Sequence, residues 1–256
     1  MDARVIRISV APVKSLGLLH PEEVELVQAG VVGDRRFWLR DEQARLYAGK
    51  RDGTMLRIRP AWDEETRRLT LTFPDGEVVD GVVELGEPVD AILYGESRPS
   101  HHVVGPWEDA ISRYVGRQLE LLWADESAVD RAPGGGTVSL VSTASLARLG
   151  VETGSDGVDG RRFRMLFEID GVGEHEEDTW IGGRLQIGAA TVAINGDVGR
   201  CILTSRDPDS GAVDLPTLAA LAGYRREGVS EPLPFGVYGS VVAPGRVRVG
   251  DIAKPL

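Results

Sequence analysis

Cys201 is the only cysteine among the 256 residues of the chain, so an internal disulfide cannot account for it. Arg200 places a permanent positive charge beside the sulfur, and such a charge favours the thiolate, the form that attacks electrophiles and binds metals. The turn residues Asp207–Gly211 follow closely, which predicts that Cys201 lies near the head of a strand leading into a hairpin. The competing interpretation is a buried cysteine that serves as a small hydrophobic side chain.

Several basic residues adjoin expected strand ends or glycine-rich loops. They are Lys14, Arg35, Arg36, Arg162, Arg164 and Arg200. Arginine suits bidentate recognition of phosphate and lysine adds a point charge, so this set predicts a local anion site. Neighbouring residues of a strand face opposite ways, so we expect only one of Arg35 and Arg36, and one of Arg161 and Arg162, in a shared cleft. In the alternative, each cation pairs with one of the 40 acidic residues.

The triple glycine Gly134-Gly135-Gly136 can turn successive backbone N–H groups toward an anion, although such a triplet also serves as a flexible turn. It lacks the Gly-Lys-Ser/Thr ending of a Walker loop. The sequence also argues against a zinc site, because the four histidines show none of the paired spacings that such sites use.

Composition and charge exclude several classes of protein. A net charge of -11 argues against a nucleic-acid partner, because affinity for phosphate backbones comes largely from Lys and Arg. One cysteine fits a reducing compartment and cannot supply the ligands of a fused iron–sulfur domain. The sequence has no run of eighteen or more apolar residues, and its N-terminus lacks the apolar core of a signal peptide. We therefore expect a cytoplasmic protein without a membrane span.

Short stretches of alternating apolar and polar residues predict a mainly β protein with a few short helices. A helix after Pro106 has Trp107, Ile111 and Tyr114 on one face, and further helices are expected after Ser142 and Pro216. The domain boundary is placed just after the first helix. Residues 1–116 are predicted to form a small antiparallel barrel or sandwich, and residues 117–256 a second β-rich domain. The acidic stretch Glu174–Asp178 is expected to be a solvated loop, with a contact to the site as the alternative.

Two groups of motifs together resemble the MOSC family, named after the C-terminal domain of molybdenum cofactor sulfurase. The C-terminal group comprises Arg200-Cys201-Ile202-Leu203-Thr204, Phe235-Gly236-Val237-Tyr238 and Gly245–Asp251. The N-terminal group comprises Pro12-Val13-Lys14-Ser15 and Gly33-Asp34-Arg35-Arg36-Phe37-Trp38, similar to elements of the family's N-terminal β-barrel. The resemblance spans nearly the whole chain and implies a MOSC β-barrel domain with a smaller N-terminal barrel.

The same resemblance implies a site for the molybdenum cofactor, a molybdopterin that carries the metal, with Cys201 as molybdenum ligand or persulfide site. The cofactor-binding positions that it implies are Lys14, Ser15, Arg36, Gly134, Gly135, Gly136, Arg164, Gly199, Arg200 and Tyr238. Two departures stand out. Gly134-Gly135-Gly136 aligns with an Asp-Thr-Ser phosphate loop of the amidoxime-reducing relatives, and Arg164-Met165-Leu166 replaces their Arg-Pro-Asn.

The activity implied by the resemblance is a two-electron reduction of small N-hydroxylated or other N-oxygenated compounds. Electrons are expected from a separate donor protein, because the chain shows no Gly-x-Gly-x-x-Gly fingerprint for a flavin or nicotinamide. Two alternatives stay open. Cys201 can carry a persulfide and deliver sulfur received from a separate pyridoxal-phosphate desulfurase, or the protein can bind the cofactor without turnover.

Overall fold

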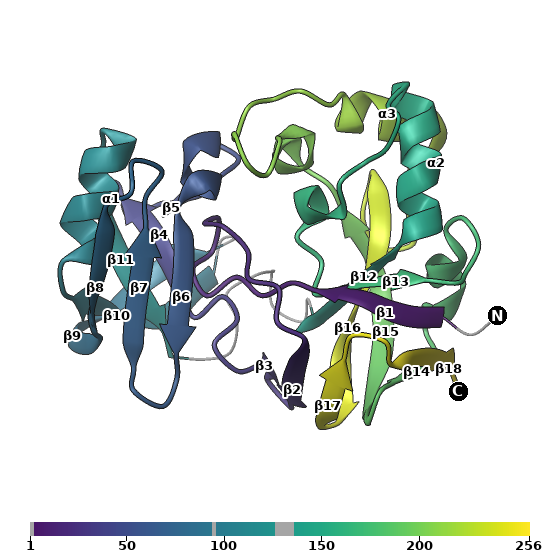
Figure 1. Cartoon of the computed structure of the whole chain (residues 1–256), viewed down its shortest axis with the longest axis horizontal. Helices are drawn as coiled ribbons and strands as arrows, with labels where there is room; N and C mark the ends of the chain where they lie inside the picture. Colours follow the sequence, from purple (N-terminus) through teal and green to yellow (C-terminus); the bar gives the residue numbers. More distant parts are fainter. Residues whose placement is uncertain (1–2, 94–95, 126–135) are drawn as a thin grey trace.

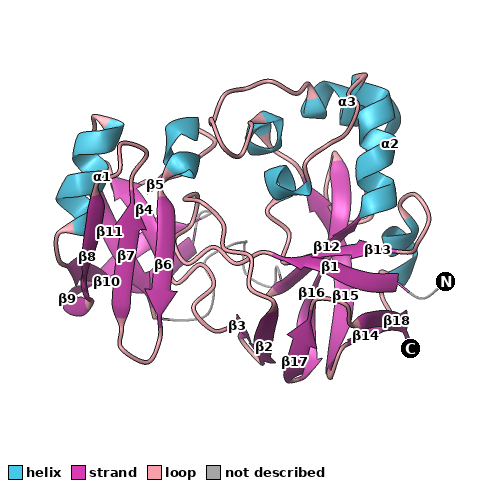
Figure 2. Cartoon of the chain, in the orientation of Figure 1, coloured by secondary structure: helices cyan, strands magenta, loops and turns pink. Residues whose placement is uncertain are grey.

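The structure is a computed structural model that describes residues 3–93, 96–125 and 136–256, and it divides into two lobes (Figure 1). Strands dominate both lobes, and helices cover the outside of each (Figure 2). The fold class predicted from the alternating apolar pattern is therefore confirmed: the protein is mainly β, with a closed barrel and further sheets.

The larger lobe is built on a closed barrel of seven strands in the order β1-β13-β12-β16-β15-β14-β18. These strands are β1 (Ala3–Ile8), β12 (Val138–Ser142), β13 (Phe167–Asp170), β14 (Arg184–Ile187), β15 (Ala190–Gly199), β16 (Pro234–Ala243) and β18 (Ile252–Pro255). Inward-facing residues such as Val5, Ile169 and Val192 are fully buried and fill the barrel, whereas their neighbours along each strand face outward. Gly239 of β16 is required because a Cβ there would lie 2.1 Å from the carbonyl oxygen of Ala193.

Two α-helices and three short 3-10 turns of the described residues cover one end of this barrel. They are α2 (Thr143–Thr153), α3 (Thr217–Tyr224), η2 (Gly160–Phe163), η3 (Glu176–Trp180) and η4 (Ile202–Ser205). Helix α2 joins the parallel strands β12 and β13; Ser142 caps its start and Gly154, with a φ of 69°, ends it. The expected helices after Ser142 and Pro216 are confirmed.

The smaller lobe is a sandwich of two antiparallel sheets. One sheet has the order β5-β4-β11-β10-β9 and the other the order β6-β7-β8. Their strands are β4 (Phe37–Asp41), β5 (Leu46–Tyr47), β6 (Arg59–Asp63), β7 (Arg68–Thr72), β8 (Val78–Val82), β9 (Glu84–Leu93), β10 (Glu96–Val104) and β11 (Leu119–Ala124). Trp107 and Ile111 of helix α1 (Trp107–Val115) are fully buried in this core, as their spacing predicts. Turn η1 (Gly53–Arg57) completes the lobe.

Strand pairing does not follow the expected boundary between residues 116 and 117. β1 pairs with β13 and β18 in the large barrel, and β11 pairs with β4 and β10 in the small lobe. A third sheet joins β17 (Gly245–Arg248) to β2 (Glu23–Val27) and β3 (Gly30–Val31). The division at residue 116 stays a prediction about domains, and hydrogen bonds between strands cross it in both directions.

Two local expectations are wrong. Cys201 does not begin a strand: it follows the end of β15 and precedes η4, and its carbonyl accepts the backbone N–H of Thr204 at 3.1 Å. The acidic stretch at Glu174–Asp178 is not wholly solvated, because Glu177 is fully buried. The turn at Asp207–Gly211 forms as expected, with the Asp207 carboxylate accepting the N–H of Ser210 at 2.7 Å. In the described ranges, no helix is both long and apolar enough to cross a membrane.

Candidate functional site

A cavity of about 430 Å³ lies where residues of the two lobes meet, and Cys201 is part of its wall. The N-terminal part of the chain contributes Lys14, Ser15, Arg35, Leu46, Ala48 and Lys50. The C-terminal part contributes Ser139, Arg162, Phe163, Arg164, Met165, Val198, Gly199, Arg200, Cys201, Leu203, Thr204 and Glu231. Among the predicted site residues, Lys14, Ser15, Arg164, Gly199, Arg200 and Cys201 are therefore brought together from positions far apart in the sequence.

The thiol of Cys201 is free and exposed, so it is available for chemistry and does not serve as core packing. Strand β15 delivers the residue to the cavity, and the turn into η4 holds it there, because the Thr204 hydroxyl also donates to the Cys201 carbonyl at 3.0 Å. The interpretation of Cys201 as a buried structural cysteine is thereby excluded.

Arg200 holds the neighbouring backbone in place. Its Nε donates to the carbonyl of Phe235 at 2.9 Å, its Nη1 donates to the carbonyl of Phe163 at 3.1 Å, and its guanidinium lies 5.2 Å from the centre of the Phe163 ring. Phe163 and Phe235 stack with their ring centroids 4.4 Å apart. Arg200 therefore joins the backbone beside the thiol to Phe163 of the cavity wall and to Phe235 behind it, which gives it a positioning role.

Three residues of the cavity wall other than glycine have left-handed backbones: Ser15 with a φ of 71°, Arg35 with 48° and Arg164 with 54°. Each such residue costs on the order of 1 kcal/mol or more, and such conformations cluster at functional sites. Two of them are tied to each other, because Arg35 donates to the carbonyl of Arg164 at 2.8 Å. This bond links the small lobe's loop before β4 to the turn after η2.

Cationic side chains dominate the charge of the cavity wall. Arg162 forms two hydrogen bonds with the Asp214 carboxylate, at 2.6 and 2.9 Å, and this pairing raises the pKa of Arg162. Arg35 pairs with the buried carboxylate of Asp34. Lys14 is only 8% exposed, and its backbone N–H donates to the carbonyl of Phe37 at 2.8 Å. Six cations and one carboxylate line the cavity among the residues that the structure describes, an excess that suits an anionic group even though Arg35 and Arg162 pair with acids as the alternative expected.

Arg36 does not line the cavity, and Arg35 takes that place. The guanidinium of Arg36 lies 4.8 Å from the centre of the Trp123 ring and donates to the carbonyl of Ala124 at 3.3 Å. One arginine of the pair lines the cavity, as expected, but strand alternation is not the reason. Both arginines precede β4, which begins at Phe37, and Arg35 has a left-handed backbone.

Tyr238 and Gly136 do not line the cavity, although Tyr238 pairs with Ser139, which does. A Cβ on Gly136 would lie 2.9 Å from the Tyr238 ring and 2.2 Å from the carbonyl oxygen of Gly239, so this glycine permits close packing against β16. Tyr238 packs against the apolar cluster under α2 and α3. Gly134 and Gly135 lie outside the described residues. The convergence of the triple glycine on an anion thus stays a prediction.

Sequence reasoning missed Lys50 and Glu231, which also line the cavity. The Glu231 carboxylate accepts the backbone N–H of Gly199 at 3.1 Å, two residues before the thiol. No local motif marks either residue. Both reach the site only because loops far apart in the sequence fold against the same cavity.

These donor types fit the cofactor that the motifs imply. A thiol offers one soft ligand for a thiophilic metal, and Lys14 and Arg164 offer charge-assisted hydrogen bonds to a phosphate.

Comparison with known proteins identifies the family of the chain. The family model of the MOSC N-terminal beta barrel domain matches residues 2–101, and that of the MOSC domain matches residues 132–254. Mitochondrial amidoxime reducing component 2 from Homo sapiens is 41% identical over 97 residues, which cover 35% of this chain and 28% of that protein. The protein of the same name from Rattus norvegicus is 34% identical over 152 residues, which cover 55% of this chain and 44% of that protein.

The matches to these curated relatives therefore span less than half of the relatives' length. A crystal structure of the YUAD protein from Bacillus subtilis covers 99% of this chain and 94% of that chain, with 12% identity and a TM-score of 0.49, a likeness that says nothing of function. The two family models occupy most of the sequence in the order that the motifs predict, so the chain belongs to the family that joins a MOSC N-terminal beta barrel domain to a MOSC domain.

Proposed function

We propose that this protein binds a molybdenum cofactor in the cavity between its lobes and reduces small N-hydroxylated or other N-oxygenated compounds. The observation that carries the proposal is the cavity itself, which places an exposed thiol among cationic side chains drawn from both lobes. Cys201 would supply the metal ligand, and Lys14, Arg164 and Ser15 would hold the cofactor's phosphate and pterin. The names of the relatives support the reaction class.

The reaction consumes two electrons and two protons, breaks an N–O bond and releases the oxygen as water. The cofactor, when bound, supplies the two-electron chemistry. The protein's own residues hold the cofactor, fix the Cys201 backbone and orient the substrate. Electrons would come from a separate donor protein.

The test is metal and pterin analysis of the purified protein, followed by reduction of an amidoxime with a reduced viologen dye. Stoichiometric molybdenum with turnover is the expected result. Cofactor-loaded protein that reduces no N-oxygenated compound would leave binding without turnover as the function.

The exposure of Cys201 also favours a second candidate, in which its thiol carries a persulfide received from a pyridoxal-phosphate desulfurase. A sulfane sulfur adduct on Cys201 in metal-free protein, without reductase activity, would favour this sulfur carrier over the reductase.

A further inference from the structure

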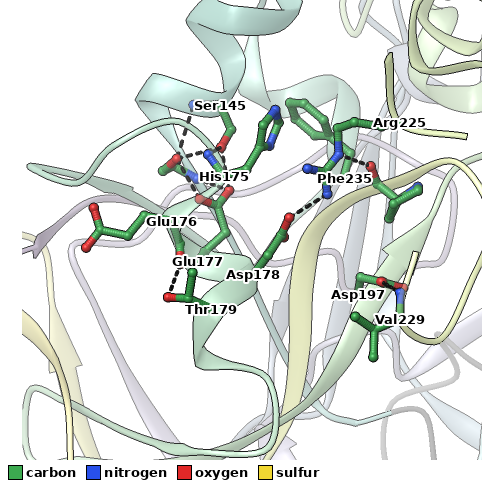
Figure 3. Close-up of polar contacts among 12 residues, drawn as sticks. Ser145, His175, Glu176, Glu177, Asp178, Thr179, Asp197, Arg225, Val229 and Phe235 are labelled. Atoms are coloured by element: carbon green, nitrogen blue, oxygen red, sulfur yellow. Dashed lines mark hydrogen bonds and ion pairs between the residues drawn. The ribbon is translucent and has the colours of Figure 1, made fainter. Parts of the chain in front are cut away.

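The loop of residues 225–233, which connects α3 to β16, contributes Glu231 to the cavity wall. Its two ends are fastened together: Arg225 Nε donates to the carbonyl of Pro234 at 2.9 Å, and Leu233 N–H donates to the carbonyl of Arg226 at 3.1 Å. Arg225 is itself fixed by the Asp178 carboxylate at 2.6 Å (Figure 3). The base of the loop therefore has one defined position on the barrel.

The tip of the loop is fastened by Asp197 of β15, which is only 2% exposed. The Asp197 carboxylate accepts the backbone N–H of Val229, and both residues are drawn in Figure 3. It also accepts the backbone N–H groups of Ser230 and Glu231, the last at 2.8 Å, and the Ser230 hydroxyl at 2.8 Å. A buried carboxylate that collects this many donors fixes the backbone of the loop tip. The Glu231 carboxylate is thereby held against Gly199, beside Arg200 and Cys201.

Glu231 differs in charge from the other ionisable side chains of the cavity wall. Among the lining residues that the structure describes, the others are Lys14, Arg35, Lys50, Arg162, Arg164, Arg200 and Cys201, and Glu231 is the one carboxylic acid. Cations suit the phosphate of a cofactor, but they repel a substrate that carries N–H donors or a positive charge. A carboxylate in the same cavity wall as the thiol supplies the complementary partner.

We propose that Glu231 is the substrate-binding residue that selects N-hydroxylated amidines and guanidines, an inference that rests on the proposed function. Such a substrate presents an N–H₂ group next to the carbon that bears the N–OH group. Its reduction takes up two electrons from the donor protein and two protons, releases water and leaves an amidine or guanidine, which binds a third proton and becomes a cation. A carboxylate oxygen can accept more than one hydrogen bond, so Glu231 can accept an N–H of that group while it keeps the bond from Gly199.

Glu231→Gln tests this role with little change of shape, because the glutamine carbonyl can still accept the N–H of Gly199. We expect the variant to raise KM for benzamidoxime by about tenfold or more. This factor corresponds to the typical free energy of one hydrogen bond to a charged group. KM for benzhydroxamic acid, which lacks the amidine N–H₂ group, should stay within about twofold. Isothermal titration of benzamidine into the cofactor-loaded protein should show the same tenfold loss of affinity, independently of turnover.

Glu227→Gln is the matched control, since this residue is exposed on the same loop and does not line the cavity. It should leave both KM values and benzamidine binding unchanged. Equal losses for both substrates in Glu231→Gln, or unchanged benzamidine binding, would overturn the assignment of Glu231. If loaded wild-type protein reduces neither substrate, the proposed reductase function fails, and the benzamidine titration still decides whether Glu231 recognises amidines.

Discussion

At the scale of single residues, the exposed thiol of Cys201 contributes little to the fold, and we propose that it serves as the metal ligand. Its side chain is exposed, and the contacts that hold the residue are made by its carbonyl with Thr204. Cys201→Ala should therefore abolish stoichiometric molybdenum binding while changing stability by no more than about 0.5 kcal/mol, as is usual for surface substitutions. Metal analysis and thermal unfolding measure the two effects. A variant with its full molybdenum content would contradict the assignment of the sulfur as ligand.

The cationic residues separate into two groups by position. Lys14 and Arg164 line the cavity, so Lys14→Gln and Arg164→Gln should each weaken cofactor retention about tenfold, through loss of one charge-assisted bond. Arg36→Gln should retain the cofactor, because Arg36 packs on Trp123 away from the cavity wall. Pterin and molybdenum content after extended dialysis is the measurement. Equal loss in all three variants would indicate a general field effect and contradict the cavity geometry.

Sequence alone could identify residues whose motif is local. Lys14, Ser15, Arg200 and Cys201 all belong to short motifs, and all reach the cavity. Glu231 could not be found in this way, because its position depends on a distant residue. Asp197 of β15 accepts the backbone N–H of Glu231 and holds the loop in place.

At the scale of elements, an acidic segment can bury one of its carboxylates, as η3 does. Glu177 of η3 lies in an acidic stretch, yet its carboxylate accepts hydrogen bonds from the backbone and hydroxyl of Ser142 and from the hydroxyl of Ser145 (Figure 3). It thus ties η3 to the first turn of α2. Short-range sequence patterns cannot reveal this, because the partners come from a segment more than thirty residues earlier. The arrangement of strands could be predicted more readily, since alternation is a local signal.

This buried carboxylate makes stability depend on pH. Burial raises the pKa of Glu177, although the hydrogen bonds from the serines oppose that shift. The folded state therefore binds the proton more tightly than the unfolded state. Its contribution to stability is fully present below the ordinary glutamate pKa of 4.5 and is lost as the pH rises through the raised value.

Glu177→Gln should consequently be more stable than wild type at pH 8, with a smaller difference at pH 4.5. Urea unfolding at the two pH values measures this change. Wild type must be measured at both pH values, because a second group also makes stability depend on pH. Burial lowers the pKa of His175 to about 4, so the contribution of His175 to the free energy of unfolding falls as the pH drops from 6.5 toward 4. A variant destabilised more strongly at pH 8 than at pH 4.5 would show instead that the carboxylate is needed in its charged form.

At the scale of the whole molecule, the cavity belongs to both lobes, because hydrogen bonds cross between them beside the site. Arg35 of the small lobe donates to Arg164 of the large one, and Arg206 donates to the carbonyl of Lys50 at 3.5 Å. The site therefore depends on how the lobes pack. Sequence motifs predict which residues belong to the site, but the packing of the lobes decides which of them meet, as Arg35 and Arg36 show.

The composition of the whole chain bears on the source of electrons. With one cysteine assigned to the metal, the sequence offers neither a ligand set for an iron–sulfur cluster nor a Gly-x-Gly-x-x-Gly fingerprint for a flavin or nicotinamide. We therefore expect the purified protein to leave NADH and NADPH unoxidised in the presence of an amidoxime, and to reduce the amidoxime when given reduced viologen or a reconstituted redox partner. Spectrophotometric assay of NADPH consumption beside product analysis distinguishes the cases. Direct turnover of NADPH by the lone chain would refute the requirement for an external donor.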